Sequence, residues 1–239
     1  MPIGVIVNCL SVVLGGLAGA AFGHKLTAEM KEKLNLVFGL SSMGIGISAI
    51  MLMQNMPAVV LALILGTILG VAVHLEQRIG RAGAAMQRLI PGASEMDDAA
   101  SALLVTTIVL FCSSGTGIYG AIVSGMSGDH SILIAKSILD FFTAMIFACQ
   151  LGAVTALVAV PQLVIFLLLF FCAKLIYPLT TPTMINDFKA CGGLIMLATG
   201  LRIARLKSFP IADMIPAMVL VWFTSALWTG IINPLLAGF

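Results

Sequence analysis

A lysine and an aspartate lie four residues apart inside an apolar stretch of this chain. Lys136 and Asp140 belong to the segment 132–150, ILIAKSILDFFTAMIFACQ, which as a helix is long enough to cross a hydrocarbon core of about 30 Å. A lone charge at that depth costs several kcal/mol, so each must pair or reach water. Residues four apart share one helix face, so the spacing predicts an intramembrane ion pair.

The same face continues with Thr143 and Gln150, which gives one polar stripe on a helix of membrane length. Such a stripe must face protein or water rather than lipid. We predict that Asp140 is a coupling-ion or proton site, with Lys136 as its counter-charge and Thr143 beside them. The alternative is that the pair is only a buried structural brace.

The composition is that of a membrane protein. Of 239 residues, 60% are hydrophobic and 9% charged, and the mean hydropathy is +1.14, whereas a soluble domain carries about 25% charged residues. We therefore expect an all-α polytopic protein that forms one transmembrane domain over 1–239, with the lipid bilayer as its partner. A net charge of +2 gives no reason to expect nucleic acid, and a homo-oligomer stays open.

Eight spans fit this pattern, and seven or nine fit with small changes of boundary. Their approximate ranges are 2–23, 34–53, 57–74, 102–124, 132–150, 154–176, 186–206 and 211–236. One set of alternate loops carries most of the basic residues, namely Lys25, Lys31, Lys33, Arg78, Arg81, Arg88, Arg202, Arg205 and Lys207. The opposite loops carry only Lys174 and Lys189. The positive-inside rule then places both termini outside.

The longest polar segment, 75–100, is expected to be a cytoplasmic amphipathic connector. Apolar residues recur in it at helical spacing, with three arginines on the other face. This pattern is typical of a helix that lies on the membrane surface, and Pro91 and Gly92 would end it. The acidic residues Glu95, Asp97 and Asp98 then precede the fourth span.

A shift of 154 residues suggests an internal repeat. It pairs spans 1–3 with spans 6–8, and the matched residues are Thr27 with Thr181, Met30 with Met184, Gly39 with Gly193, Leu40 with Leu194 and Gly46 with Gly200. An offset of five crossings would make the repeats inverted, as in many secondary transporters.

Span four contains SSGTG, Ser113–Gly117, near its middle. Small and hydroxyl residues weaken a helix there and offer oxygen ligands, so Ser113, Ser114 and Thr116 are candidate binding residues. Close packing through small residues is the alternative. In span one, Asn8 would either brace a neighbouring helix or contact a ligand, because a buried amide needs several hydrogen-bond partners.

Glycines mark helix-packing surfaces. Span one carries a ridge of small residues with a spacing of four, and span seven carries a second group; the residues are Gly15, Gly19, Gly23, Gly192, Gly193 and Gly200. Such ridges let helix backbones approach closely, within one chain or between subunits.

Polar residues also suggest helix ends. Asp187, with Asn186, and Asp213 would open spans seven and eight, where a carboxylate complements a helix N-terminus. Asn233 and Pro234 would close span eight. The five cysteines are isolated, and no catalytic, nucleotide-binding or metal-binding motif occurs, so we expect no cofactor, no metal and no enzyme activity.

Several segments of the chain are distinctive, namely VIVN near the start, KEKL before span two, GDHSILIAKSILD over 128–140, and GGLIMLATGL with IADMIPA towards the end. Together they resemble a known family, the YqgA-like bacterial inner-membrane proteins, a family of unknown function. The family's Gly-Asp…Lys-Ser-x-x-Leu-Asp element falls on Gly128, Asp129, Lys136, Ser137 and Asp140. The chain departs from it in span four, where Cys112 is followed by Ser113, and in span three, where Val71 replaces a frequent glutamate.

The resemblance covers nearly the whole chain and implies a multi-pass protein of the bacterial inner membrane, but it implies no reaction. Taken with the charged pair, the sequence favours a small transporter or channel for an ion or small polar solute. The alternative is a structural or regulatory membrane protein without transport activity.

Overall fold

A computed structural model describes residues 1–22, 27–91, 96, 98–112 and 114–237, and all regular structure in these ranges is helical. The longer helices are α1 (Ile3–Phe22), α2 (Ala28–Ile50), α3 (Met56–Ala72), α4 (Leu75–Gln87), α5 (Asp98–Cys112), α6 (Gly115–Ser127), α7 (Ser131–Leu151), α9 (Ala159–Ile176), α10 (Pro182–Ile203) and α12 (Ala217–Leu227). The short elements are α8 (Val154–Leu157), η3 (Tyr177–Leu179), α11 (Ile211–Met214), η4 (Trp228–Ile232) and α13 (Asn233–Ala237).

Six helical stretches of the described chain are long and apolar enough to cross a membrane, or seven if the bent pair α3 and α4 is one span. The all-helical membrane class is therefore confirmed, and the expected count of eight is not. The remaining predicted span corresponds to α10, which is 22 residues long but carries Asp187, Lys189 and Arg202.

The exposed side chains explain how these helices meet lipid. Apolar residues of α1 lie exposed at helical spacing, and so do those of α3 and α9; in α1 they are Ile3, Ile6, Val7, Leu10, Leu14 and Leu17. A continuous exposed apolar stripe would be unfavourable in water, and it is the expected outer surface of a membrane helix.

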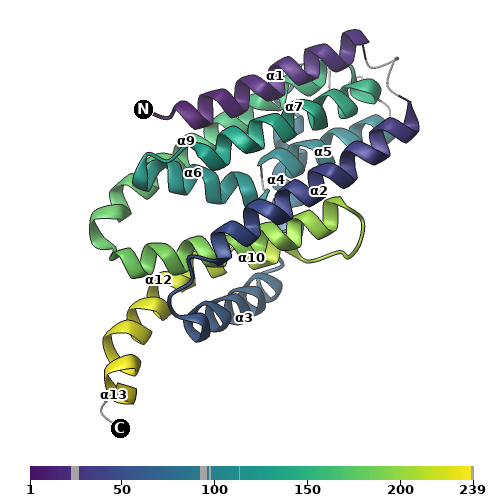
Figure 1. Cartoon of the computed structure of the whole chain (residues 1–239). Helices are drawn as coiled ribbons and strands as arrows, with labels where there is room; N and C mark the ends of the chain where they lie inside the picture. The colour runs from purple at the N-terminus through teal and green to yellow at the C-terminus, as the bar shows by residue number, and fades with distance from the viewer. Residues whose placement is uncertain (23–26, 92–95, 97, 113, 238–239) are drawn as a thin grey trace. The chain divides into compact units, whose positions relative to one another are not determined.

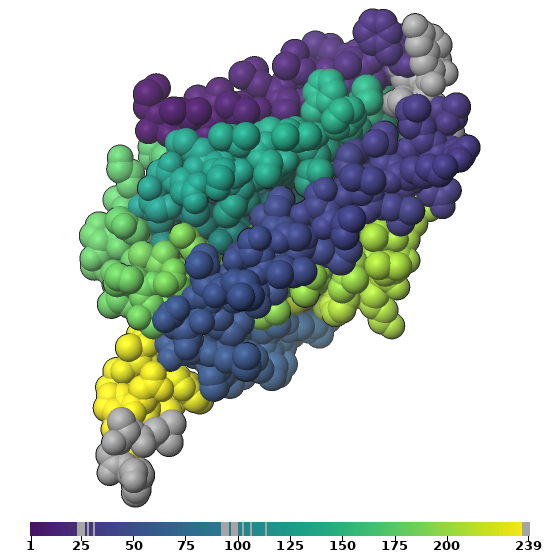
Figure 2. Space-filling view, viewed as in Figure 1, coloured from purple at the N-terminus to yellow at the C-terminus, as the bar shows by residue number. Residues whose placement is uncertain are grey.

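The chain forms two compact units, and unit 1 comprises Met1–Phe38 and Gln77–Leu175. In unit 1, α1 runs beside α7 (Figure 1), and the two helices are in contact along their length in the space-filling view (Figure 2). Gly15 and Gly19 allow this, because a Cβ at either would collide with the backbone of Phe141 or Met145 in α7. The predicted glycine ridge therefore packs within the chain, while Gly23 lies outside the described residues.

Unit 2 comprises Gly39–Glu76 and Ile176–Phe239. Here α3 packs against α12, with Gly66 directly over the backbone of Ala217. The second part of α2 crosses α10, where Gly46 faces Gly193. Gly192 is buried in the same helix, so the glycines of span seven also pack inside the chain.

Asp213 lies in the first turn of α11, where span eight was expected to begin, whereas Asp187 does not open its own span. α10 begins earlier, at Pro182, with the Thr181 side chain accepting from the backbone N–H of Met184 at 3.3 Å. Asp187 therefore lies in the second turn of α10. Asp213 accepts from the backbone N–H of Glu76 at 3.0 Å, at the first turn of α4. Sequence proximity indicated the wrong helix for Asp187 alone, because its hydrogen bonds to the backbone of Gln54 and Asn55 are long-range.

The end of span eight also differs from the expectation. Asn233 and Pro234 do not end the helical stretch, since Asn233 begins α13 after the π-helical turn η4. The Asn233 side chain donates to Asn55 Oδ1 at 3.0 Å. The α4 helix, in contrast, begins at Leu75 as predicted.

Candidate functional site

The predicted ion pair is present in unit 1. Lys136 Nζ donates to Asp140 Oδ2 at 2.5 Å, and both side chains are more than nine-tenths buried. They lie on the face of α7 that also buries Leu133 and Ala144. The two charges neutralise each other, and they do so on a helix face that is buried in the protein and does not face lipid.

Two amide side chains from other helices hold the same carboxylate. Asn8 of α1 donates through Nδ2 to Asp140 Oδ2 at 2.8 Å. Gln162 of α9 donates through Nε2 to Asn8 Oδ1 at 2.9 Å and, more weakly, to Asp140 Oδ2 at 3.4 Å. Asn8 and Gln162 are both fully buried. The site is therefore a four-residue polar cluster, Asn8, Lys136, Asp140 and Gln162, within three helices.

The cluster leaves two oxygen atoms free among the described residues. All three donors end on Oδ2 of Asp140, and Oδ1 accepts from none of the described side chains. The carbonyl oxygen Oε1 of Gln162 is buried and has no partner. The two hydrogen bonds that Gln162 Nε2 donates determine the orientation of its amide. If the amide were flipped, its oxygen would face two other acceptors, Asn8 Oδ1 and Asp140 Oδ2.

A broken helix lies against the lysine. Span four is interrupted between α5 and α6, where Ser114 caps α6 by accepting from the backbone N–H of Gly117 at 3.1 Å. A Cβ on Gly117 would lie 2.9 Å from Cε of Lys136 and would also collide with Phe166 of α9. Glycine is thus required for the start of α6 to approach the cluster.

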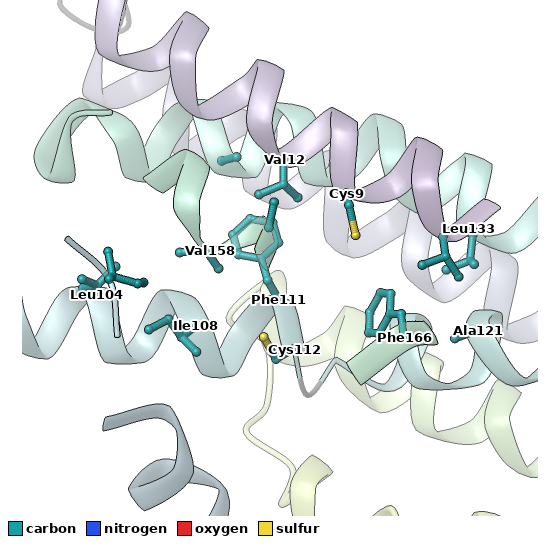
Figure 3. Packing of buried hydrophobic residues seen from close by; sticks show 14 of the residues in the cluster. Cys9, Val12, Leu104, Ile108, Phe111, Cys112, Ala121, Leu133, Val158 and Phe166 are labelled. Carbon is teal, nitrogen blue, oxygen red and sulfur yellow. The ribbon is translucent and has the colours of Figure 1, made fainter. Parts of the chain in front are cut away.

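The candidate binding residues that the sequence predicted in span four lie on both sides of this break or within it. Thr116 is buried in the first turn of α6, Ser114 is its cap, and Ser113 lies outside the described residues. The ring of Phe111, at the end of α5, has its centroid 5.8 Å from Lys136 Nζ, within the range of a cation–π contact. Figure 3 shows Phe111 pointing from α5 toward Val12 and Val158.

Thr143, predicted to extend the polar stripe, does not join the cluster's hydrogen bonds. Its hydroxyl donates to the carbonyl of Leu139 in its own helix at 2.8 Å, and Gln150 is exposed. Sequence reasoning missed Gln162, although the shift of 154 residues pairs it with Asn8 and it is a lone amide in a long apolar segment.

Unit 2 contains a second buried carboxylate, Asp187, whose two oxygens are both used. Oδ1 accepts from the backbone N–H groups of Gln54 and Asn55, both at 2.8 Å. Oδ2 accepts from Asn55 Nδ2 at 2.9 Å and from Ser225 Oγ at 2.6 Å. The four hydrogen bonds and the positive end of the α3 dipole together stabilise the negative charge of Asp187. This arrangement is the one expected of a structural brace.

An apolar groove of about 650 Å³ lies in unit 1 between α1 and the α8–α9 segment. Its walls are apolar side chains with the thiol of Cys9, and they include Leu10, Val13, Val160 and Leu163. Within the part of the chain that the structure describes, no amide, hydroxyl or charged side chain lines this groove, so it suits a lipid chain rather than a polar solute.

The apolar helices, their exposed apolar stripes and the buried ionic cluster define the class, a helical membrane protein. The chain belongs to the family described as "Protein of unknown function (DUF554)", whose model matches residues 3–226.

Two relatives extend over nearly the whole chain. The chain is 48% identical over 231 residues to the uncharacterized protein YqgA of Escherichia coli strain K12, covering 96% of this chain and 98% of that protein. It is 25% identical over 226 residues to the uncharacterized membrane protein YdfK of Bacillus subtilis strain 168, covering 91% and 93%. These matches confirm the YqgA-like family. No solved structure matches the chain.

Proposed function

We propose that this protein is a small transporter or channel for an ion or small polar solute, and not an enzyme. The observation that carries the proposal is the Asn8–Lys136–Asp140–Gln162 cluster, buried beside a helix that is broken within its span. Ionisable residues inside a membrane are costly and typically mark an ion or substrate pathway. Broken helices typically line the binding site of a transporter.

An inverted repeat, which we also propose, would fit this function. In unit 1, Gln162 contacts Asn8, and in unit 2, Ser42 Oγ donates to the carbonyl of Met196 at 3.1 Å. Both contacts join residues 154 positions apart. The same shift relates spans 1–3 to spans 6–8, so each contact joins residues that the repeat makes equivalent.

The glycine contacts of α2 and α10 support the same repeat. A Cβ on Gly39 would lie 2.7 Å from the carbonyl oxygen of Gly200, and one on Gly46 would lie 2.7 Å from that of Gly193. In the other direction, a Cβ on Gly200 would lie 2.6 Å from the carbonyl oxygen of Gly39, and one on Gly193 would lie 2.6 Å from that of Gly46. A shift of 154 residues maps Gly39 onto Gly193 and Gly46 onto Gly200, so it converts each of these two contacts into the other. The earlier glycine of α2 contacts the later glycine of α10, so the two helices are antiparallel. Equivalent antiparallel helices are related by a two-fold axis across them, which is the relation of inverted repeats.

Flux into proteoliposomes tests the proposal. Stopped-flow light scattering would follow glycerol and urea, and pyranine fluorescence would follow protons during jumps of sodium or potassium chloride. We expect wild-type protein to transport at least one of these probes faster than protein-free liposomes, and Asp140→Asn to abolish that flux. Equal flux in wild type and Asp140→Asn would refute the role of Asp140.

A structural or regulatory role is the second candidate, and one observation favours it. In the Asp187 cluster, a buried carboxylate of this chain has both oxygens occupied by four donors, as expected for a structural brace. If the four-residue cluster does the same, no probe will move faster than through protein-free liposomes.

A further inference from the structure

We infer that Asn8 of α1 and Gln162 of α9 alternate as the residue that positions Asp140, so that the cluster has two states. In the state of this structure, the shorter of the two amide hydrogen bonds to Asp140 comes from Asn8. In the second state it comes from Gln162. This inference rests on the proposed function, because the alternation would be the conformational step of the transporter. Lys136 remains paired with Asp140 in both states.

The two amides compete for a single oxygen atom. Asn8 Nδ2 lies 2.8 Å from Asp140 Oδ2, and Gln162 Nε2 lies 3.4 Å from the same atom. Gln162 Nε2 makes its shorter hydrogen bond to Asn8 Oδ1, at 2.9 Å. Both nitrogens therefore already lie beside Asp140 Oδ2, and only a small displacement is needed to exchange the short contact and the long one.

An unpaired oxygen indicates what the second state is. Gln162 Oε1 is buried and accepts no hydrogen bond from the described part of the chain, and a buried acceptor without a partner is unfavourable. If both amides turn together, Gln162 Nε2 takes the short contact to Asp140, and Gln162 Oε1 accepts a hydrogen bond from Asn8 Nδ2. Asn8 Oδ1 then becomes the unpaired oxygen. The second state is thus the present one with the two amides exchanged.

The two states are expected to have similar free energies. Each contains one short hydrogen bond from an amide to Asp140, one hydrogen bond between the two amides, and one unpaired amide oxygen. The terminal torsions of Asn and Gln side chains have broad minima, so the amides can turn without a large rotamer penalty. States that differ so little in their interactions are both populated at equilibrium.

The helices around the cluster form two closely packed pairs. In the first pair, a Cβ on Gly15 or Gly19 of α1 would collide with the backbone of α7. In the second pair, a Cβ on Gly125 of α6 would collide with the backbone carbonyl of Phe170 in α9. Backbones in such close contact move together, so the α1–α7 pair and the α6–α9 pair are each expected to shift as a unit.

The cluster joins these two pairs. Asn8 and Asp140 belong to α1 and α7, whereas Gln162 belongs to α9. Both helices of the second pair begin at a break in the chain's helical structure. α6 begins at the break that Ser114 caps, and Pro161, in the first turn of α9, has no N–H to continue the hydrogen bonds of α8. These breaks can absorb a small shift of the α6–α9 pair against the α1–α7 pair.

The proposed repeat relates the same two amides. Asn8 and Gln162 are 154 positions apart, which is the shift that relates spans 1–3 to spans 6–8, so the repeat makes them equivalent. In transporters with inverted repeats, alternating access is largely a movement of one repeat against the other. An exchange of roles between two equivalent side chains is what such a movement would produce at their point of contact.

Fluorine NMR on the full-length protein in detergent tests the alternation. The substitution Val164→Cys gives an exposed position on α9 for a trifluoromethyl label, in a background of Cys149→Ala and Cys172→Ala, since these two native cysteines are not buried. With an otherwise native sequence, we expect a main resonance and a minor one that exchanges with it, detected by saturation transfer.

Variants of the two amides assign these resonances. Gln162→Met removes the second amide and should leave the main resonance alone. Asn8→Leu removes the first amide and should leave the minor one alone. A change of environment near the label would move a resonance, whereas the alternation changes only the intensities at two fixed positions. Thr143→Val is the matched control, because Thr143 bonds only to its own helix, and it should leave both intensities unchanged.

A double variant decides the question even if a single one is unstable. Asn8→Gln with Gln162→Asn keeps both amides and exchanges their lengths. It should show both resonances with an intensity ratio changed by about threefold to tenfold, the effect of a typical neutral hydrogen bond. An unchanged ratio would overturn the inference. So would the absence of saturation transfer, in the native cluster, at the position of the minor resonance.

Flux separates the alternation from the proposed function. Asn8→Leu and Gln162→Met, each limited to one state, should both lose the probe flux of the native cluster. If they show one resonance each and keep that flux, the alternation is not the transport step and the inference is wrong. Flux that only Asp140→Asn abolishes would still support the transporter. Two exchanging resonances without flux of any probe would support the two states and refute the transporter.

Discussion

Two of the three carboxylates buried among the described residues, Asp187 and Asp140, show how hydrogen-bond partners distinguish a structural brace from a candidate site. Asp187 uses both oxygens to bind four donors and has no basic partner among them. Asp140 receives every donor on one oxygen and is paired with Lys136. A fully satisfied carboxylate has no capacity for another ligand, whereas Asp140 keeps one.

For the charged pair, single and double substitutions should give different results. Lys136→Met alone and Asp140→Leu alone should each destabilise by about 3–5 kcal/mol, because one buried charge is left uncompensated. The double variant should recover most of that stability yet stay inactive in flux assays, since transport needs the carboxylate. Denaturation and flux on one preparation measure both. A stable and fully active double variant would show that the pair is only a brace.

For Asp187, we expect loss of stability without a specific effect on transport. Asp187→Ala would leave the Gln54 and Asn55 N–H groups and the Ser225 hydroxyl without their acceptor, at about 1–3 kcal/mol for each buried donor. Asp187→Asn is the matched control, since it keeps an acceptor oxygen and should lose less. Thermal unfolding in detergent compares the two. Equal stability of Asp187→Ala and wild type would contradict the role as a brace.

At the scale of the elements, close helix contacts position the cluster. Asn8 reaches Asp140 because α1 lies against α7, and Gly15 and Gly19 permit that distance. Gly117 has the same role at the start of α6, beside Lys136. In membranes, such contacts gain dispersion energy only when no side chain keeps the backbones apart.

Gly19→Leu tests this packing, with Gly44→Leu as its control. A leucine at Gly19 would collide with Met145 and Ala148 of α7, whereas Gly44 is exposed and has no atom within 4 Å of an added Cβ. Overpacking typically costs about 1–3 kcal/mol, and a branched side chain at so close a contact should reach the upper end. Melting temperatures in one detergent measure the difference. If the two variants were equally stable, the α1–α7 contact would not depend on glycine.

For the molecule as a whole, the distribution of basic residues predicts its orientation in the membrane. Nine basic residues fall on one set of alternate loops and two on the other. With an even number of crossings, the positive-inside rule places both termini outside and the start of α4 in the cytoplasm. The described chain has six or seven helical stretches of membrane length, and an odd number of crossings would place the termini on opposite sides.

Reporter fusions test the orientation directly. Alkaline phosphatase fused after Phe239 should be active, because this enzyme folds outside the cytoplasm, and green fluorescent protein inserted near Met86 should fluoresce, because it folds inside. An inactive phosphatase at the C-terminus would show that the number of crossings is odd or that the orientation is reversed. The matched control is a phosphatase inserted near Met86, which should be inactive.

Local sequence patterns were enough to predict the class of protein, the charged pair and the weakened helix in span four. Each depends on local physics: an apolar segment of membrane length needs a helix, charges four residues apart share a face, and Ser114 and Gly115 permit a new helix start. The connector helix was predictable for the same reason, since its amphipathic period lies within one segment.

Contacts between helices far apart in the sequence determine which residues complete the site. Gln162 is 154 positions from Asn8 and 22 from Asp140, and Asp187 caps a helix that begins 131 residues before it. Thr143 lies at the predicted spacing but bonds to its own helix. A polar side chain in an apolar helix needs a hydrogen-bond partner, and the local sequence does not specify which residue provides it. That choice depends on which helices pack together, and the glycines permit a close approach without specifying the partner helix.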